Sequence, residues 1–461
     1  MNSNNYKDLQ LRQKAFFATQ NTKSFAFRKE ALLKLKKALA ENEHAIYEAL
    51  ESDFKKSKFE AYISEIGIVE LEVDLALKNL KSWAKPKRVF PSLLNFPSSD
   101  YLIKEPYGQI LLISPWNYPF QLAIIPLISA IAAGNTCILK PSELAPNTSV
   151  LLKKLLNSIY DEEFVAVIEG GVPVATSLLH LRWDYIYFTG SVPVGKIIAK
   201  AAAVHITPVT LELGGKSPCI IDNSVNVKLV ARRIVWAKLL NAGQTCVAPD
   251  YLLVHPKIKA PLIEALQTEI IKRYGTNVQE SPDYPRIINT KNHQRLVSLL
   301  TDTSVLFGGN HDAADCYLSP TLVDEPGLDH PIMQEEIFGP ILPILTYTDE
   351  KHIESIILGI EKPLSFYVFS TRLKWAKSLM IKFSFGGGVI NDAMIHYGNS
   401  RLPFGGVGHS GIGNNHGKYG FDTFSHEKPV VKKANWLDLP LRYAPYSGKL
   451  NFIKTIFRWL G

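Results

Sequence analysis

A cysteine and a glutamate in the middle of the chain have surroundings typical of a reactive pair. Glu212 comes just past a predicted strand and Cys246 just past a predicted helix, each with glycine close by. A free thiol has a pKa of about 8.5, so a nucleophilic cysteine needs a positive environment or a nearby base, which Glu212 could be. A lone cysteine is more often a small buried apolar residue. Gly243 and the polar pair after it interrupt the helical pattern of residues 229–240, however, so we expect Cys246 at a turn.

These elements belong to a chain that alternates between strands and helices. Residues 110–202 predict four βα units, and residues 218–274 predict a second α/β region. Such alternation indicates an α/β fold with a parallel sheet covered on both faces, whose ligands bind beyond the carboxyl ends of the strands. Residues 24–50 and 60–83 carry apolar positions at helical spacing and predict two packing helices.

One uncharged stretch, residues 106–139, is long enough to cross a bilayer. Pro115, Pro119 and Pro126 interrupt it, and each interior proline removes a backbone hydrogen bond from a helix. We therefore expect a buried strand, a loop, a helix and a second strand rather than a spanning helix.

The motifs around the reactive pair resemble those of the NAD(P)-dependent aldehyde dehydrogenase superfamily. Residues 212–216 read E-L-G-G-K and residues 243–246 read G-Q-T-C, as that family's glutamate and cysteine motifs do. The continuation to Tyr251 and the short amino terminus are most similar to the class 3 branch, which acts on fatty and aromatic aldehydes. The resemblance runs from about Lys29 to Lys432.

The resemblance implies an aldehyde dehydrogenase-like fold with a Rossmann-like cofactor domain, a second α/β catalytic domain and a small β oligomerisation element. The expected boundaries are 1–85 and 105–208 for the NAD(P)-binding domain, 209–422 for the catalytic domain, 86–104 and 423–445 for the oligomerisation element, and 446–461 for an amphipathic tail.

The cofactor turn is expected at residues 190–195. No G-x-G-x-x-G follows the first strand. Instead a glycine-flanked turn follows a strand and opens a helix, where backbone N–H groups could hold a pyrophosphate. It matches the family's G-S-x-x-x-G turn and consists of Gly190, Ser191, Val192, Pro193, Val194 and Gly195.

The resemblance also assigns roles to other loop residues. Asn117 stands in the P-W-N motif, in which the amide donates to the developing oxyanion. Lys140 and Glu143 are expected near the adenosine ribose, Glu336 at the nicotinamide ribose and Phe338 near the nicotinamide. Further cofactor contacts are expected from Trp116 and Leu213, and the loop 402–411 is expected to close one side of the substrate entrance.

Together these residues predict oxidation of an apolar aldehyde to the acid through a thioester. Cys246 attacks as a thiolate, Asn117 and the Cys246 N–H hold the oxyanion, and Glu212 then activates water. We expect NAD to be preferred or at least accepted, with NADP as the alternative, because Glu143 would repel a 2′-phosphate. Two alternatives stay open: a CoA-acylating aldehyde dehydrogenase, whose relatives commonly lack a glutamate at this place, and a catalytically silent binding or structural protein on the same fold.

Composition sets the remaining expectations. The net charge of +8 is modest for 461 residues, and the basic residues are interleaved with acidic ones. This pattern argues against nucleic-acid binding. Four widely spaced cysteines and a polar amino terminus favour a cytoplasmic protein. We expect no metal site at His409 and His416, because no carboxylate or cysteine ligand lies close to them in sequence. We expect a homodimer, with at most weak peripheral membrane contact through an amphipathic helix at residues 449–461.

Overall fold

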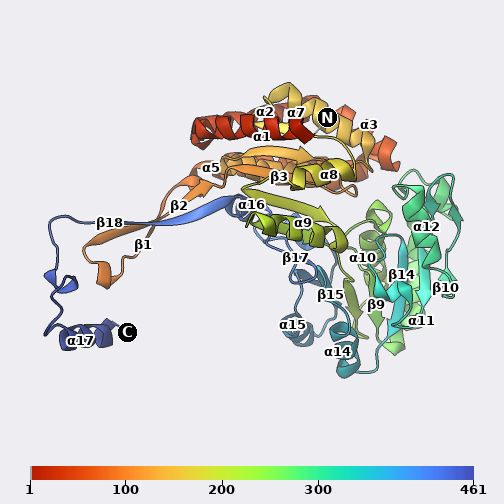
Figure 1. Cartoon of the computed structure of the whole chain (residues 1–461). Coiled ribbons are helices and arrows are strands. Elements are labelled where there is room, and N and C mark those ends of the chain that lie inside the picture. Colours follow the sequence, from red (N-terminus) through yellow and green to blue (C-terminus); the bar gives the residue numbers. More distant parts are fainter. Residues whose placement is uncertain (1–2, 461) are drawn as a thin grey trace.

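The computed structural model describes the backbone of residues 3–460 (Figure 1). Residues 1, 2 and 461, which the predicted first domain and tail include, lie outside the described residues. The first sheet has six strands in the order β17-β7-β6-β3-β4-β5 and is parallel except for β17. Its strands are β3 (Gln109–Ile113), β4 (Thr136–Lys140), β5 (Val165–Val167), β6 (Tyr185–Gly190), β7 (Val209–Leu213) and β17 (Gly411–Ile412). The parallel α/β sheet predicted from the alternation is confirmed.

Helices cover both faces of this sheet, so its strands are almost entirely buried. One apolar core joins the sheet to α2, α3, α5, α6 and α7, and another joins it to α1, α8 and α9. Their bounds are α1 (Ser3–Ala18), α2 (Phe25–Glu41), α3 (Glu43–Phe54), α5 (Gly67–Ala84), α6 (Gln121–Ala133), α7 (Pro146–Ile159), α8 (Val172–Leu179) and α9 (Val192–Val204). The uncharged stretch 106–139 forms β3, α6 and β4, as predicted.

The two predicted amino-terminal helices are each interrupted. The predicted helix 24–50 is wrong as one element, because Asn42 breaks it into α2 and α3. The Asn42 amide donates to the Ala38 carbonyl at 2.8 Å and so competes for an acceptor of the helical backbone. The second predicted helix begins with α4 (Lys58–Ala61) and a π-helical turn, Tyr62–Ile66, before α5 continues.

The second sheet has seven strands in the order β10-β13-β14-β9-β8-β15-β16 and is parallel except for β10. Its strands are β8 (Pro218–Ile221), β9 (Tyr251–Val254), β10 (Ser304–Phe307), β13 (Thr321–Asp324), β14 (Ile341–Thr346), β15 (Ser365–Phe369) and β16 (Gly387–Ile390). The accompanying helices are α10 (Val227–Leu239), α11 (Lys259–Tyr274), α12 (Thr290–Ser298), α13 (Pro331–Gln334), α14 (Glu350–Leu358) and α15 (Leu373–Lys382), with a small hairpin of β11 (His311–Asp312) and β12 (Tyr317–Leu318). The predicted α/β pattern of residues 218–274 is confirmed.

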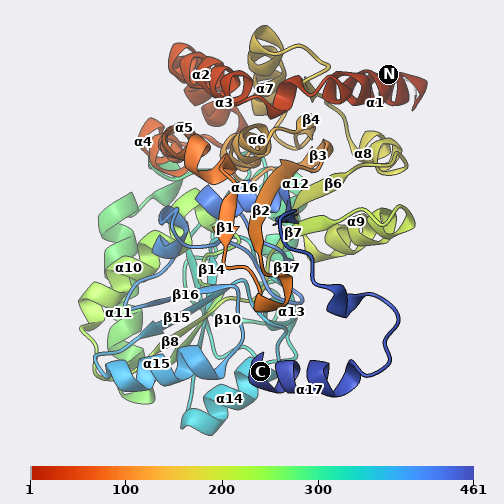
Figure 2. The ribbon, with the colours of Figure 1, turned by 90° about the vertical axis from the view of Figure 1, so that its left-hand side faces the viewer.

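A three-stranded antiparallel sheet projects from the body as an arm (Figure 1). It consists of β1 (Lys87–Val89), β2 (Ser98–Pro106) and β18 (Ser425–Lys433), and β18 follows α16 (Gly417–Thr423), which packs on α6. Past β18 the chain leads to α17 (Leu450–Leu460), which Figure 2 also shows away from the first sheet. No helix in the described part of the chain is long and apolar enough to cross a membrane.

Candidate active site

Cys246 lies in a turn after α10, as predicted. The Ala248 N–H donates to the Thr245 carbonyl at 3.0 Å and closes that turn. The three residues before Gln244 all have positive φ, with 54° at Asn241, 51° at Ala242 and 76° at Gly243. A left-handed residue other than glycine costs about 1–3 kcal/mol, so the surrounding contacts must hold this conformation. Glycine is required at 243, because a Cβ there would lie 2.2 Å from the Gly339 carbonyl oxygen.

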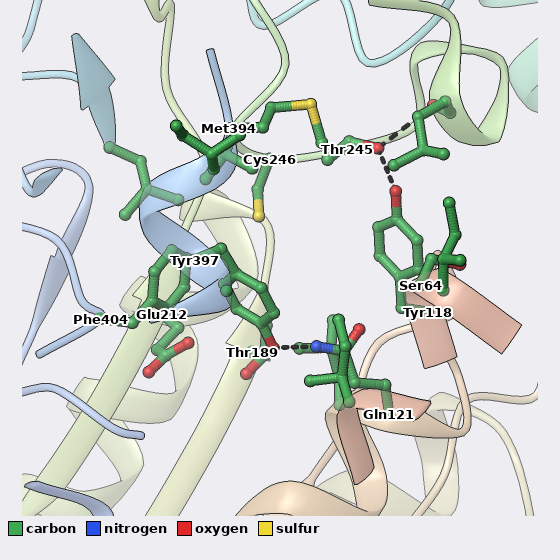
Figure 3. Close-up of a pocket in the computed structure, with 18 of the residues that line it drawn as sticks. Ser64, Tyr118, Gln121, Thr189, Glu212, Thr245, Cys246, Met394, Tyr397 and Phe404 are labelled. Carbon is green, nitrogen blue, oxygen red and sulfur yellow. Dashed lines mark hydrogen bonds between the residues drawn. The ribbon is translucent and has the colours of Figure 1, made fainter. Parts of the chain in front are cut away.

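The Cys246 sulfur points into a cavity with about 1010 Å³ of empty space, including its open mouth. Figure 3 shows the sulfur on the side of Tyr397 and Glu212, with Tyr118 opposite. Most of the other lining residues are apolar: Ile63, Ile68, Leu122, Leu213, Trp236, Leu240, Val247, Leu364, Met394, Ile395 and Phe404. The cavity therefore suits an apolar substrate that presents one polar group to Cys246.

Glu212 lies within β7 and not just past it, so the predicted end of that strand is wrong. The strand continues because Glu212 pairs with Thr189 on one side and with Gly411 of β17 on the other. The residue is 4% exposed, and one carboxylate oxygen has no hydrogen-bond partner among the residues that the structure describes. Burial raises the pKa of Glu212 to about 8, against a smaller opposing effect of the Tyr187 hydroxyl. A carboxylate with this pKa can exchange protons near neutral pH.

The thiol of Cys246 is half-buried and is held in its neutral form. Burial raises its pKa above the ordinary thiol value, and the carboxylates of Glu336 and Glu212 raise it further. The backbone N–H groups of Cys246 and Val247 act in the opposite direction. The charged side chains with the largest effect on the thiol are thus negative, which differs from the positive environment that a nucleophilic cysteine needs.

Asn117 is tied to the loop that carries the nucleophile. Its side-chain Nδ2 donates to the Gln244 carbonyl at 3.0 Å, and its own carbonyl accepts from Nδ2 of Asn241 at 2.7 Å. The residue is 4% exposed. Because an amide nitrogen carries two hydrogens, this bond leaves the second N–H of Asn117 available to another acceptor.

The turn 190–195 joins β6 to α9: Gly190 is the last residue of the strand, and residues 192–195 are the first turn of the helix. Ser191 is the N-cap of α9 and makes no side-chain cap bond, so backbone N–H groups of the first turn remain available to an anion. Gly195 lets the helix pack against Leu213, whose side chain would lie 2.7 Å from a Cβ at that position. At the end of β4, which is separated from β6 by β3, Lys140 forms an ion pair with Glu143 at 2.6 Å.

Among the other predicted cofactor residues, Glu336 lies close enough to Cys246 to raise the pKa of its thiol. Trp116 and Phe338 pack edge to face, with ring centroids 5.3 Å apart. The Glu336 carboxylate lies so close to Gly214 that a Cβ there would be 1.9 Å from Oε2. Burial, and then the charge of Asp250, raise the pKa of Glu336 to about 8. These residues and the turn 190–195 form a chemically suitable cradle for a dinucleotide, with N–H donors for phosphate and carboxylates for ribose hydroxyls.

Several lining residues were not singled out from the sequence. Ile63 and Ser64 come from the π-helical turn, and Trp236 comes from α10. The Gln121 amide donates to the Tyr397 hydroxyl across the cavity. Helical spacing predicts that such residues are buried, but it does not tell a core from a cavity wall. In the predicted loop 402–411, Phe404 lines the cavity and the Ser410 carbonyl accepts from the Leu213 N–H at 3.1 Å. Among residues 3–460, no group of three His, Cys, Asp or Glu side chains could hold a metal ion.

The chain belongs to the aldehyde dehydrogenase family. That family's model matches residues 9–430, which is most of the chain. The fold and the arrangement of Cys246, Glu212 and Asn117 agree with this membership, and the chain is an aldehyde dehydrogenase.

Individual relatives place it with the class 3 type. It is 51% identical to the 4,4'-diaponeurosporen-aldehyde dehydrogenase of Staphylococcus aureus, over 96% of this chain and 97% of that one. It is 44% identical to human aldehyde dehydrogenase family 3 member B1, over 94% and 92% of the two chains. A solved structure of Staphylococcus aureus AldH in a substrate-bound state superposes with a TM-score of 0.96 at 50% identity, covering 98% of this chain and 99% of that one.

Proposed function

We propose that this enzyme oxidises a long or medium-chain aliphatic, or an aromatic, aldehyde to the carboxylic acid through a covalent bond to Cys246. The observation that carries the proposal is that the Cys246 sulfur and the Glu212 carboxylate line one mostly apolar cavity. The proposal also agrees with the relative from Staphylococcus aureus, whose name specifies a 4,4'-diaponeurosporen-aldehyde.

In the first half of the reaction the Cys246 thiol gives its proton to water, the resulting thiolate adds to the carbonyl carbon, and the carbonyl electron pair moves to oxygen. The Asn117 amide and the Cys246 backbone N–H donate to that oxyanion, and each donor stabilises the transition state by about 3 kcal/mol. When bound, NAD or NADP accepts the hydride that the former aldehyde carbon loses. The carbon is then a thioester on Cys246.

In the second half Glu212 acts as general base. Its carboxylate takes a proton from water, the hydroxide adds to the thioester carbonyl, and the C–S bond breaks to return the thiolate. The carboxylic acid leaves through the cavity. The unpartnered, buried oxygen of Glu212 supports this role, because it has no hydrogen bond to the protein that a water would have to displace.

For the cofactor we propose NAD, with NADP as the alternative. The residues that would hold it are Trp116, Lys140, Glu143, Gly190, Ser191, Val192, Pro193, Val194, Gly195, Leu213, Glu336 and Phe338. Glu143 would disfavour a 2′-phosphate, whereas its ion-pair partner Lys140 would favour one. We therefore expect NAD to be accepted and the preference to be small.

A screen of aldehydes of increasing length, with each cofactor, tests the proposal. The expected result is reduced cofactor with both, faster turnover of apolar substrates, and the free acid as product. The same reactions with coenzyme A present test the acylating alternative, which predicts an acyl-CoA instead. No cofactor reduction with any aldehyde would favour a catalytically silent protein.

We further propose that the enzyme is a cytoplasmic homodimer whose arm makes the subunit contact. The four cysteines are free thiols, as suits a reducing compartment. Phe90 and Leu93 lie exposed between β1 and β2, at 101% and 69%. Light scattering should give twice the chain mass, and a monomeric mass would contradict the proposal.

We propose only weak, salt-sensitive membrane contact for α17. Phe452, Phe457 and Trp459 are exposed on a helix that also carries Lys454 and Arg458. Co-sedimentation with anionic liposomes, for the full chain and for a form ending at Ser447, measures this contact. Binding that persists at high salt and disappears on truncation would contradict it.

A further inference from the structure

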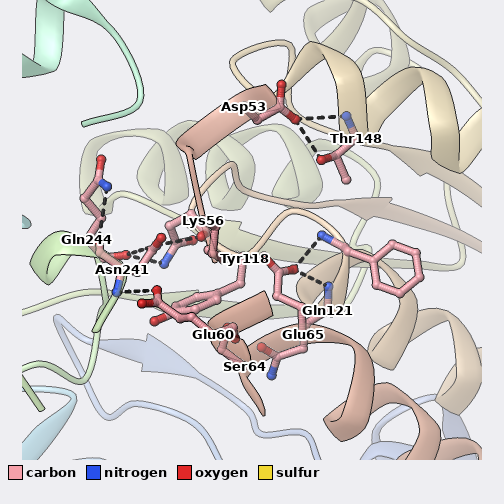
Figure 4. Close-up of polar contacts among 12 residues, drawn as sticks. Asp53, Lys56, Glu60, Ser64, Glu65, Tyr118, Gln121, Thr148, Asn241 and Gln244 are labelled. Atoms are coloured by element: carbon pink, nitrogen blue, oxygen red, sulfur yellow. Dashed lines mark hydrogen bonds and ion pairs between the residues drawn. The ribbon is translucent and has the colours of Figure 1, made fainter. Parts of the chain in front are cut away.

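Behind the nucleophile turn lies a buried polar cluster that the proposed reaction does not use (Figure 4). It is formed by Lys56, Glu60 and Glu65, which are 2%, 7% and 0% exposed. Burying charged groups is unfavourable unless they are paired and hydrogen-bonded, so each side chain should have a specific partner. The two glutamates do have partners, and each holds a different part of the active site.

Glu60 holds the turn that leads to the nucleophile. Its carboxylate accepts a hydrogen bond of 2.8 Å from the backbone N–H of Asn241, the first of the three residues with positive φ. The Asn241 side chain in turn donates to the carbonyls of Asn117 and Gln244, at 2.7 and 3.2 Å. A continuous series of hydrogen bonds thus links Glu60 to Asn117 and to the loop two residues before Cys246.

Glu65 holds the other end of the segment that carries Asn117. One of its oxygens accepts from the N–H groups of Phe120 and Gln121, both at 3.0 Å, at the start of α6. Its second oxygen accepts from Nζ of Lys56 at 2.8 Å. Glu60 lies in α4, directly before the π-helical turn that contains Glu65. The cluster therefore fixes Asn117 and Cys246 relative to each other.

A purely structural cluster would stabilise the fold without any special relation to catalysis. Two observations favour a closer relation. Glu60 contacts the segment Asn241–Gly243 that leads to Cys246, and that segment has an unfavourable backbone that its contacts must maintain. A displacement of about 1 Å between reacting groups can lower a rate by about 100-fold.

We propose that Glu60 is a positioning residue for aldehyde oxidation. It keeps the turn Asn241–Gly243 left-handed and, through the Asn241 side chain, sets the Asn117 amide relative to the Cys246 sulfur. This inference rests on the proposed roles of Asn117 and Cys246. It adds to them a residue of the amino-terminal segment, far from both in sequence.

The test compares kcat and KM of the full-length enzyme with those of three Glu60 variants. Glu60→Ala removes the acceptor, and we expect kcat and the rate of the first NADH turnover to fall by about 10- to 100-fold. The KM for NAD should stay within about 3-fold, because the cluster does not contact the cofactor cradle. Glu60→Gln keeps an acceptor oxygen and should recover kcat to within about 3-fold.

Glu60→Asp keeps the charge but shortens the side chain by one methylene. It therefore tests the hydrogen bond to the Asn241 N–H even if the alanine variant does not fold. The control is Asp53→Ala. Asp53 also accepts from backbone N–H groups, those of Asn147 and Thr148 at 3.1 and 2.9 Å, but these belong to α7. We expect kcat to be unchanged in that variant. Wild-type kcat in Glu60→Ala or Glu60→Asp would overturn the proposal, and so would a loss in Glu60→Gln as large as in Glu60→Ala.

A double-mutant cycle provides an independent readout. Asn241→Gly removes the amide but keeps the backbone N–H and tolerates the positive φ. If Glu60 acts through Asn241, the two losses in kcat are not additive, whereas additive losses would overturn the proposal. Cys246→Ala, measured alongside the cycle, separates a failure of the proposed function from a failure of the proposed role of Glu60. Turnover in that variant would mean that the nucleophile itself is wrongly assigned, not only the positioning role of Glu60.

Discussion

The two regions that meet at Cys246 are built differently. The proposed cofactor side consists of the turn 190–195 at the end of β6, Gly214 just past β7 with Glu336 against it, and Lys140 at the end of β4 paired with Glu143. The cavity side is a mostly apolar wall formed by segments from most of the chain length. The cofactor side depends on backbone geometry and charge, and the cavity side depends on shape and apolar area. A substitution on one side should therefore change the binding of either the cofactor or the aldehyde, but not of both.

The largest effect should come from Cys246, where the two regions meet. Cys246→Ala removes the only atom proposed to bond the substrate, so we expect kcat to fall at least about 1000-fold. The Kd of NAD, measured by fluorescence titration, should stay within about 3-fold, because the proposed cradle does not include the thiol. Cys316→Ala is the matched control, since Cys316 is also a free and partly exposed cysteine. Substantial turnover in the Cys246 variant would remove the basis of the comparison.

Glu212 should affect only the second half of the reaction. In Glu212→Gln we expect a rapid first turnover of NADH followed by a steady state slower by about 100- to 10,000-fold, because the general base for water is lost. Stopped-flow absorbance separates the two phases. If the first turnover disappears as well, Glu212 instead activates the thiol.

The raised pKa of Glu212 gives this role a pH dependence. Its folded-state pKa is about 8, and the base is the deprotonated form, so steady-state kcat should rise with pH through about 8 and level off above it. In Glu212→Gln this rise of kcat with pH should be absent. If kcat of both proteins rises over the same pH range, the titrating group is not Glu212.

The smallest effect should be confined to the cavity side. Trp236 lines the cavity and is 43% exposed. Trp236→Ala removes apolar contact area and should raise the KM of a long-chain aldehyde by about 10-fold, with little change for a short one or for NAD. Trp436→Ala is the matched control, because Trp436 is an exposed tryptophan just past β18 that does not line the cavity. An equal change for short and long aldehydes would show that the wall does not select by length.

This contrast also explains what the sequence could predict. Short motifs encode backbone geometry locally, so the turn 190–195, the position of Cys246 at a turn and the alternation of strands and helices follow from the sequence. The wall is assembled by tertiary packing, and helical spacing alone does not tell whether Ile63 or Trp236 faces a core or a cavity. The roles of the predicted site residues and the domain boundaries stay predictions.

Two errors have identifiable causes. Asn42 divides a helix whose apolar spacing continues on both sides, so periodicity alone could not detect the break. Glu212 lies inside β7 because β17, about 200 residues later in the chain, extends the sheet beside it. Neither the left-handed Asn241 and Ala242 nor their contact with Glu60 has a signal in sequence spacing, because the partners are far apart.

The central claim is that Cys246 carries the substrate as a thioester that Glu212 resolves. Intact-protein and peptide mass spectrometry of Glu212→Gln, quenched in acid after mixing with NAD and an apolar aldehyde, tests it most directly. The predicted result is a mass gain equal to the acyl group, located on the peptide that contains Cys246 and lost on treatment with hydroxylamine. An unmodified protein after a complete first turnover of NADH, or an adduct on Cys137, Cys219 or Cys316 instead, would contradict it.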